Sequence, residues 1–130
     1  MKKKNYATIA KKSAEIQINE LKKIKKVFNN SFNKAIDLIL KCKGKVIFAG
    51  IGKSGLVARK ISATFSSVGI PSFFCDPAQA LHGDMGQIEK KDILIVFSYS
   101  GNTSELNNML KYANRFQIKI IGVASKPDSI

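Results

Sequence analysis

The hydrophobic positions of this chain follow two patterns, one before and one after Lys45. Before it, apolar residues recur every three or four positions among lysines, which is the spacing of one face of an amphipathic helix. This pattern predicts helices over 3–28 and 31–42, with Ser31 placed to cap the second one. The apolar stripe consists of Ala14, Ile18, Leu21, Ile24, Phe28, Phe32, Ala35 and Ile39.

After Lys45 short apolar runs alternate with helical segments. The runs are continuous rather than alternating, which is typical of parallel strands buried on both faces. The pattern therefore predicts an α/β fold: a parallel sheet covered by helices, preceded by an N-terminal helical segment. Right-handed crossovers place the carboxyl ends of all strands at one edge, where such sheets bind ligands. We expect strands at 45–50, 71–75, 92–97 and 118–124 and intervening helices at 54–68 and 102–115.

Length and charge narrow the class of protein. A chain of 130 residues makes one α/β domain, and we divide it into helices at 1–44 that pack on the sheet and the sheet domain at 45–130. No segment predicts a membrane span or a signal peptide, so we expect a cytoplasmic protein without a membrane partner. Of the net charge of +13, residues 1–45 carry +10, from thirteen lysines and three acidic residues. We interpret these lysines as the solvated face of the helices. Nucleic-acid binding, which would weaken steeply with salt, is the alternative that we do not favour.

The most informative motif is Ser98-Tyr99-Ser100-Gly101-Asn102-Thr103, between a buried strand and a helix. The start of a helix presents unpaired N–H groups and a partial positive charge, and both favour an anion. The Ser98, Ser100 and Thr103 hydroxyls add donors, and Gly101 permits close approach of a ligand. The motif predicts a binding site for the phosphate group of a small molecule. The alternative is an ordinary capped turn.

A second strand, glycine-rich turn and helix lie at 45–68. The turn Gly50-Ile51-Gly52-Lys53-Ser54-Gly55 lacks the spacing of a P-loop. It does fit the dinucleotide pattern G-x-G-x-x-G, and Asp76 follows near the distance expected of a ribose-binding acid, so nucleotide binding stays open. Lys53 adds a cation, which favours an anionic or polyhydroxylated ligand.

The third loop of interest lies between the second and third predicted strands. It contains His82, the one histidine of the chain, which can exchange protons near neutral pH. Asp84 is placed either to orient His82 or to close an Asx-turn. Cys42 and Cys75 have no metal-ligand spacing, and we expect both to be reduced, small buried residues.

Together these motifs resemble the sugar isomerase (SIS) domain, within it most closely the D-arabinose 5-phosphate isomerase family. The resemblance extends from about Lys12 to the C-terminus. It rests on Gly50–Gly55, Pro71–Phe74, His82-Gly83-Asp84-Met85-Gly86 and Ser98–Glu105. It implies a flavodoxin-like three-layer sandwich and a phosphorylated pentose as substrate. It also implies conversion between D-arabinose 5-phosphate and D-ribulose 5-phosphate through a cis-enediol, without metal or organic cofactor, for the synthesis of Kdo and lipopolysaccharide.

The resemblance also assigns roles to single residues. It implies that Lys53, Glu105 and His82 are catalytic: Lys53 neutralises charge on the enediol, Glu105 is a base, and His82 serves ring opening or proton transfer. A helix-dipole role for Glu105 and a solvated loop role for Lys53 are the alternatives. Substrate contacts are implied for Ser54, Gly69, Ile70, His82, Ser98, Ser100 and Thr103.

Two departures from the family pattern matter. Asp76 replaces a histidine that is linked to inhibitory zinc in the family, so we name no metal ligand. The chain also stops at Ile130, before the further strand, helices and CBS domains of full-length members. We therefore expect an incomplete domain whose fourth strand leaves an exposed edge. The family forms tetramers, so we expect a homo-oligomer. The alternative function is a non-catalytic phosphosugar-binding module.

Overall fold

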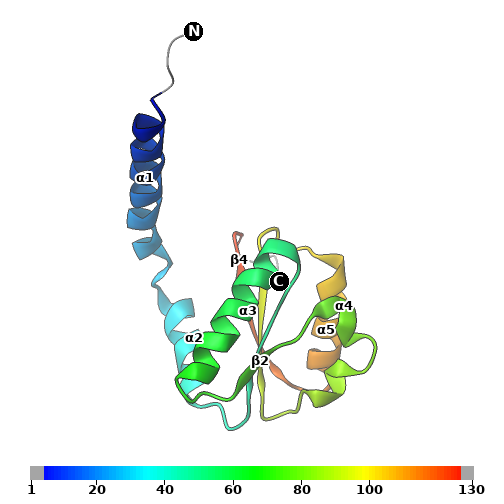
Figure 1. Cartoon of the computed structure of the whole chain (residues 1–130). Helices are drawn as coiled ribbons and strands as arrows, with labels where there is room; N and C mark the ends of the chain where they lie inside the picture. Colours follow the sequence, from blue (N-terminus) through cyan, green and yellow to red (C-terminus); the bar gives the residue numbers. More distant parts are fainter. Residues whose placement is uncertain (1–4, 127–130) are drawn as a thin grey trace. The chain divides into compact units, whose positions relative to one another are not determined.

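The computed structural model describes residues 5–126, which form two compact units divided between Ile36 and Asp37. Figure 1 follows the elements along the chain. They are α1 (Tyr6–Lys23), η1 (Ile24–Val27), α2 (Asn30–Leu40), β1 (Val46–Gly50), α3 (Gly52–Ser67), β2 (Ser72–Phe74), α4 (Pro77–Ala80), η2 (Asp84–Gln87), β3 (Ile93–Ser98), α5 (Ser104–Arg115) and β4 (Lys119–Ala124).

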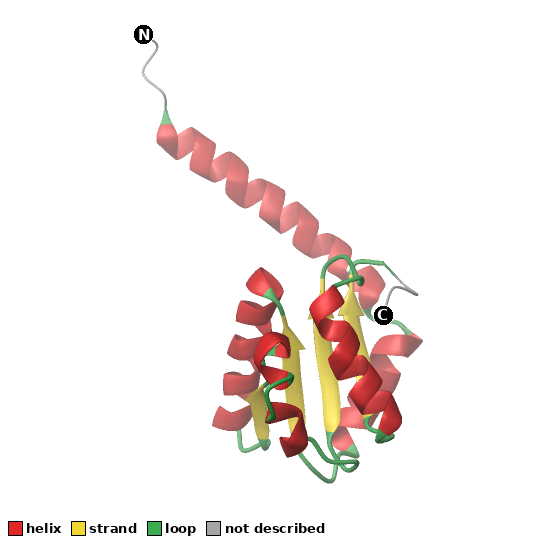
Figure 2. Ribbon diagram, turned by 90° about the vertical axis from the view of Figure 1, so that its right-hand side faces the viewer, coloured by secondary structure: helices red, strands yellow, loops and turns green. Residues whose placement is uncertain are grey.

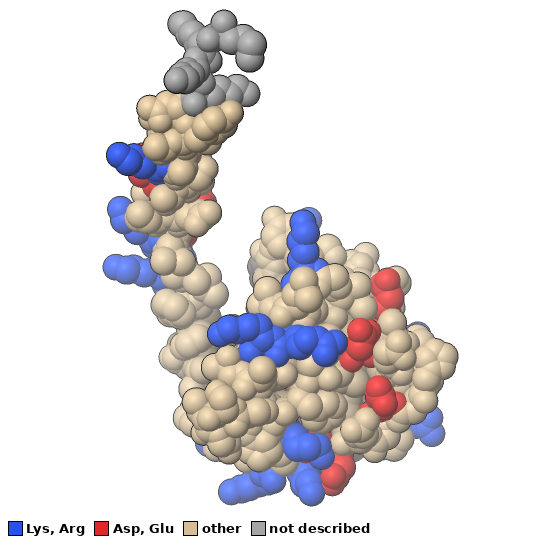
Figure 3. Space-filling model, viewed as in Figure 1, with Lys and Arg blue, Asp and Glu red and all other residues tan. Residues whose placement is uncertain are grey.

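The first unit consists of helices, as the apolar periodicity predicts. The predicted helix 3–28 is α1 followed by the 3-10 turn η1, and residues 3 and 4 lie outside the described residues. No residue of α1 is buried, and lysine side chains stand along it (Figure 3). The prediction that Ser31 caps α2 is wrong. The Asn29 side chain accepts from the N–H of Ser31 at 2.9 Å, because a residue just before the helix can reach its free N–H groups.

The second unit is built on four parallel strands in the order β2-β1-β3-β4. The central strands β1 and β3 are buried on both faces, which explains their unbroken apolar sequences. Successive side chains alternate between the faces: Ile47 and Leu94 pack with α5, and Phe48 and Ile95 pack with α3. Helices cover both faces (Figure 2), so the predicted three-layer α/β fold is confirmed.

Two boundaries differ from the sequence prediction. The last turn of α2 belongs to the second unit, where Leu38 and Ile39 pack against the core beside β1 and β3. That the whole segment 1–44 packs on the sheet stays a prediction. The segment between β2 and β3, expected to be a loop, contains α4 and η2. The short helix α4 forms because Asp76 caps it and Pro77, with its fixed φ, occupies its first position.

Two boundaries of the sheet matter for a ligand site: its outermost strand and the edge at which the strands end. β4 is the strand at one side of the sheet; its residues are exposed or half-buried, as expected for an edge strand. Because the strands are parallel, the carboxyl ends of β1, β2, β3 and β4 lie at one edge of the sheet, which we call the carboxyl edge. Among residues 5–126 no helix is long and apolar enough to cross a membrane.

Candidate functional site

The two long helices that begin at the carboxyl edge, α3 and α5, have no side-chain cap. Ile51 precedes α3 and has no capping group, and Thr103 precedes α5 without capping it. By contrast, Asn5, Asn29 and Asp76 cap α1, α2 and α4 through their side chains. The starts of α1, α2 and the very short α4 thus have side-chain caps, whereas the starts of α3 and α5 are left open.

Several backbone N–H groups at these helix starts therefore have no acceptor. Within the described part of the chain nothing accepts from the N–H groups of Gly52, Lys53 and Ser54, nor from those of Thr103 and Ser104. Free N–H groups at a helix start, together with the helix dipole, favour an anion. The carboxyl edge thus has two such helix starts, which follow the neighbouring strands β1 and β3.

The loop between β3 and α5 is held by its own hydroxyl groups. Ser98 is 3% exposed; its Oγ lies 2.7 Å from the Thr103 Oγ1 and accepts from the Gly101 N–H at 3.0 Å. This bond takes the Thr103 hydroxyl away from the helix start, so the motif is not an ordinary capped turn. Gly101 has φ +70°, which favours glycine. Ser100 is exposed, and its Oγ accepts from the Asn102 N–H at 3.2 Å. Ser98 and Thr103 thus shape the loop, and Ser100 faces solvent.

The turn between β1 and α3 brings the helix start very close to the strand. A Cβ at Gly55 would lie 2.5 Å from the Gly50 carbonyl oxygen, so only glycine fits at this contact. Lys53 is exposed in the first turn of α3, and within residues 5–126 no carboxylate pairs with it. Ser54, half-buried, follows it. The turn therefore places an unpaired ammonium group beside free N–H groups.

Glu105 lies in the first turn of α5. Its own backbone N–H and the Ser104 hydroxyl, which donates to Glu105 Oε2 at 2.9 Å, lower the pKa of this carboxyl group. Glu105 is therefore ionised at neutral pH and able to accept a proton. Ser104 was not singled out from the sequence, although a hydroxyl next to a candidate base is a signal that could have found it.

His82 lies just after α4, at the same edge of the sheet. It is exposed, and its backbone N–H donates to the Gln79 carbonyl at 2.9 Å. The Asp84 carboxylate accepts from Gln87 Nε2 at 3.2 Å, so this bond goes to Gln87 and not to His82. Asp76, considered as a ribose ligand, accepts from the Ala78 N–H at 2.9 Å as the cap of α4.

The two cysteines are free thiols, and only Cys75 is fully buried; Cys42 is partly buried. Burial, with the charges of Asp84 and Asp76, raises the pKa of the Cys75 thiol to about 11. The Cys75 thiol is therefore protonated at neutral pH and packs as a small apolar group in the core.

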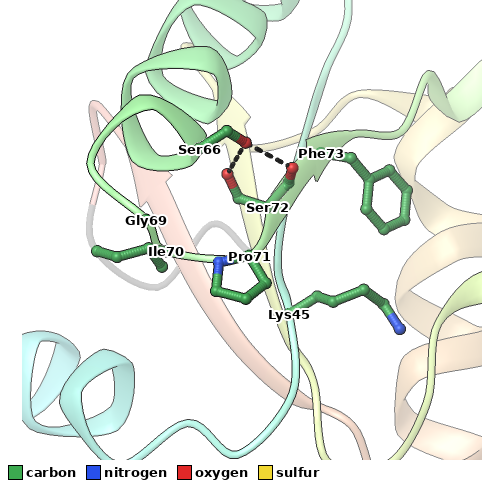
Figure 4. Close-up of a pocket in the computed structure, with 7 residues that line it drawn as sticks. All are labelled: Lys45, Ser66, Gly69, Ile70, Pro71, Ser72 and Phe73. Atoms are coloured by element: carbon green, nitrogen blue, oxygen red, sulfur yellow. Dashed lines mark hydrogen bonds between the residues drawn. The ribbon is translucent and has the colours of Figure 1, made fainter.

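Gly69 and Ile70 lie at the opposite edge of the sheet. They come after α3 and before β2, where the chain has returned to the amino ends of the strands. There they line a hollow of about 400 Å³ with Lys45 and Ser72 (Figure 4). The Ser72 Oγ lies 3.0 Å from the Ser66 Oγ in its wall. The structure thus brings Lys53, Ser54, His82, Ser98, Ser100, Thr103 and Glu105 to one edge, and Gly69 and Ile70 to the other.

The fold is an α/β domain of the doubly wound class, with two uncapped helix starts at the carboxyl edge of its sheet. Comparison with known proteins gives the family. The model of the SIS domain matches residues 39–130, and the chain belongs to this family.

Relatives of known name agree with this assignment. The chain is 43% identical over 125 residues to the Haemophilus influenzae protein named probable arabinose 5-phosphate isomerase, and the match covers 96% of this chain and 37% of that protein. It is 40% identical over 114 residues to arabinose 5-phosphate isomerase GutQ of Escherichia coli, and this match covers 88% of this chain and 36% of that protein. The chain thus spans little more than a third of the length of these curated relatives.

Solved structures share the same fold, and one of them holds a sugar phosphate. A protein of Escherichia coli CFT073 in complex with arabinose 5-phosphate is 34% identical, with a TM-score of 0.82. The match covers 96% of this chain and 68% of that one. The fold is shared with a phosphoheptose isomerase from Neisseria gonorrhoeae, at 18% identity and a TM-score of 0.69. This match covers 95% of this chain and 77% of that one.

Proposed function

We propose that this chain carries the phosphosugar site of an aldose–ketose isomerase that interconverts D-arabinose 5-phosphate and D-ribulose 5-phosphate. The observation that carries the proposal is the pair of uncapped helix starts at the carboxyl edge, which also holds Lys53 and Glu105. The names of the curated relatives and the related complex with arabinose 5-phosphate support this substrate.

In this proposal the phosphate binds at the start of α5. The free N–H groups of Thr103 and Ser104 and the exposed Ser100 hydroxyl donate to its oxygens. The hydrogen bond between Ser98 and Thr103 keeps the loop in the shape that leaves these donors free. Ser54, at the start of α3, contributes a hydroxyl for the sugar.

The chemistry is a proton transfer between two neighbouring carbons. The Glu105 carboxylate removes the proton from C2 of the open-chain aldose, and the electron pair forms the C1–C2 double bond. The carbonyl electrons move to O1, which takes up a proton, and the product is a cis-enediol. Return of a proton to C1 and loss of the O2 proton give the ketose. Lys53 stabilises the negative charge on the enediol oxygens, and His82 moves the hydroxyl proton.

No metal or organic cofactor is needed for these steps. The arabinose 5-phosphate formed would enter the synthesis of Kdo for lipopolysaccharide, and we place the reaction in the cytoplasm. Gly69 and Ile70, implied as substrate contacts by the family resemblance, would have to act from the edge opposite to the other residues. Their contact with substrate stays a prediction.

The first experiment follows the C2 proton of D-arabinose 5-phosphate by NMR in deuterated water with the purified 130-residue chain. Exchange at C2 together with formation of ribulose 5-phosphate is expected. A Glu105→Gln variant, which keeps the shape of the side chain and removes the base, is the matched control. Equal exchange rates for the wild type and this variant would contradict the role of Glu105.

The second candidate function is non-catalytic binding of a phosphosugar. The observation that favours it is that, among the described residues, no hydrogen bond or ion pair joins Lys53, His82 and Glu105. This function predicts shifts of the amide signals of Ser100 and Ser104 on addition of arabinose 5-phosphate, without any exchange at C2.

We also propose that the chain forms a homo-oligomer through its N-terminal helices. The apolar stripe of α1 and η1 is exposed: Ile18 is 54% and Leu21 69% exposed. Contiguous exposed apolar surface is typical of an interface between proteins. Sedimentation equilibrium tests the proposal. An Ile18→Asp/Leu21→Asp variant should be monomeric, whereas an unchanged mass would exclude this interface.

A further inference from the structure

A residue just after β4 contacts the loop of residues 99–103 between β3 and α5, which we call the anion loop because it precedes the proposed phosphate site. Ser125 comes directly after β4, and its partner Tyr99 directly follows β3. The Ser125 N–H donates to the Tyr99 carbonyl at 3.2 Å, and the Ser125 Oγ donates to the same oxygen at 2.5 Å. The backbone bond continues the ladder of the two parallel strands by one step beyond the pair Ser98 and Ala124. The hydroxyl bond is added by the side chain.

Among the described residues, no other hydrogen bond is made by the C=O or N–H group of the peptide between Tyr99 and Ser100. The Tyr99 side chain is 83% exposed, so its packing does not hold this residue in place. The Ser98 hydroxyl bonds to Gly101 and Thr103, and the Ser100 hydroxyl bonds to Asn102, so neither reaches this peptide. The two donors of Ser125 are the hydrogen-bond partners that the structure shows for the Tyr99 carbonyl.

The orientation of this peptide decides the direction of one free donor. In a trans peptide the C=O and the following N–H point in opposite directions. With the Tyr99 carbonyl turned toward Ser125, the Ser100 N–H points away from the β4 side. In residues 5–126 nothing accepts from this N–H. It lies in the same loop as the free N–H group of Thr103, and the free N–H group of Ser104 follows at the start of α5.

We propose that Ser125 is a positioning residue of the phosphosugar site. It holds the Tyr99 carbonyl on the β4 side so that the Ser100 N–H stays directed at the anion. This inference rests on the proposed function, because it assigns the Ser100 N–H to the same phosphate. It adds the end of β4 to a site otherwise formed by the turns after β1, β2 and β3.

The test compares Ser125→Ala, which removes the hydroxyl bond and keeps the backbone bond, with Ser125→Thr, which keeps both. Ser67→Ala is the matched control: its hydroxyl is also exposed and donates to a backbone carbonyl, that of Thr64 at 2.7 Å, at the far end of α3. NMR titration with D-arabinose 5-phosphate and with inorganic phosphate measures affinity, and the carbonyl carbon shift of Tyr99 in the free protein reports the hydrogen bond directly.

We expect Ser125→Ala to weaken both ligands about three- to tenfold, the value of one hydrogen bond, with the Tyr99 carbonyl shift changed. Ser125→Thr restores both readings, and Ser67→Ala leaves both unchanged. Wild-type affinity in Ser125→Ala, or an equal loss in Ser67→Ala, overturns the inference.

The two proposals fail in different ways. If the wild type binds inorganic phosphate but not D-arabinose 5-phosphate, the proposed function fails, and the inference is decided by the phosphate affinities and the Tyr99 shift. If the wild type binds neither anion, both are overturned.

Discussion

The hydroxyl pair in the anion loop gives the sharpest prediction, because it joins two candidate ligand residues to each other. Ser98→Ala removes the bond to Thr103 at 2.7 Å and the acceptor of the Gly101 N–H at 3.0 Å. Each such bond contributes about 0.5–1.5 kcal/mol net, so we expect the free energy of unfolding to fall by about 1–3 kcal/mol. Affinity for D-arabinose 5-phosphate should fall as well, because the freed Thr103 hydroxyl can turn to cap α5 and occupy a phosphate donor.

A double-mutant cycle separates this pair from general damage. Ser98→Ala, Thr103→Val and the double variant are compared by urea unfolding. We expect a coupling energy of about 0.5–1.5 kcal/mol between the two sites, the value of their shared hydrogen bond. Additive effects of the two substitutions would refute the argument that Thr103 is held by Ser98.

Ser62→Ala is the control for removing a buried serine hydroxyl. Ser62 is 5% exposed, and its Oγ donates to the Arg59 carbonyl at 3.1 Å within α3. Alanine favours the helix, so the free energy of unfolding should change by less than about 0.5 kcal/mol. A loss as large as that of Ser98→Ala would show that the effect comes from burial alone.

Three further predictions follow from single contacts. Asp92→Asn should lower the free energy of unfolding by about 2–4 kcal/mol. The buried Asp92 carboxylate accepts from the N–H groups of Lys45 at 2.7 Å and Glu89 at 2.8 Å, and an amide retains only one acceptor oxygen. Urea unfolding measures the loss, with the exposed Asp37→Asn as the control, and equal losses in the two variants would contradict the prediction. The pKa of Glu105 is lowered, so its carboxylate form should persist as pH falls through the ordinary range of a glutamate and should decline only below that range. Exchange at C2 should follow the same pH dependence. Carboxyl-carbon NMR titration measures the pKa of Glu105, and a raised pKa would contradict the prediction. Gly55→Ala should destabilise the domain by about 1–3 kcal/mol, because the Cβ of the alanine would lie 2.5 Å from the Gly50 carbonyl oxygen. An unchanged midpoint of thermal unfolding would show that β1 and α3 can move apart without a loss of stability.

Local patterns were sufficient to predict the four strands, the two long helices between them and their order, but not the short helices α4 and η2. Unbroken apolar runs indicate strands buried on both faces, and β1, β3, α3 and α5 lie within a few residues of the predicted ranges. The Ser98–Thr103 motif and the Gly50–Gly55 turn follow such strands directly. Parallel strands put their carboxyl ends at one edge, so the placement of Lys53, His82 and Glu105 together also follows from the sequence.

Hydrogen-bond partners were harder to predict because each polar side chain had more than one candidate in the sequence. Ser31 and Asn29 could both cap α2, and Asn29 does. Asp84 could orient His82, but its carboxylate binds Gln87. Thr103 stands at a capping position, yet its hydroxyl bonds to Ser98. In each case local composition allows several bonds, and the backbone path selects one of them.

The sequence by itself determined the alternation of strands and helices, the glycine- and hydroxyl-rich turns after β1 and β3 and the chemical groups in these turns, because these depend on periodicity and on residues adjacent in the chain. Only the tertiary structure decided which distant groups meet. The contact of Ser125 with Tyr99 arises because β3 and β4 are neighbours in register, although the two residues are 26 positions apart. The separation of Gly69 and Ile70 from the other site residues has the same origin: α3 returns the chain to the amino ends of the strands, which sequence proximity does not reveal.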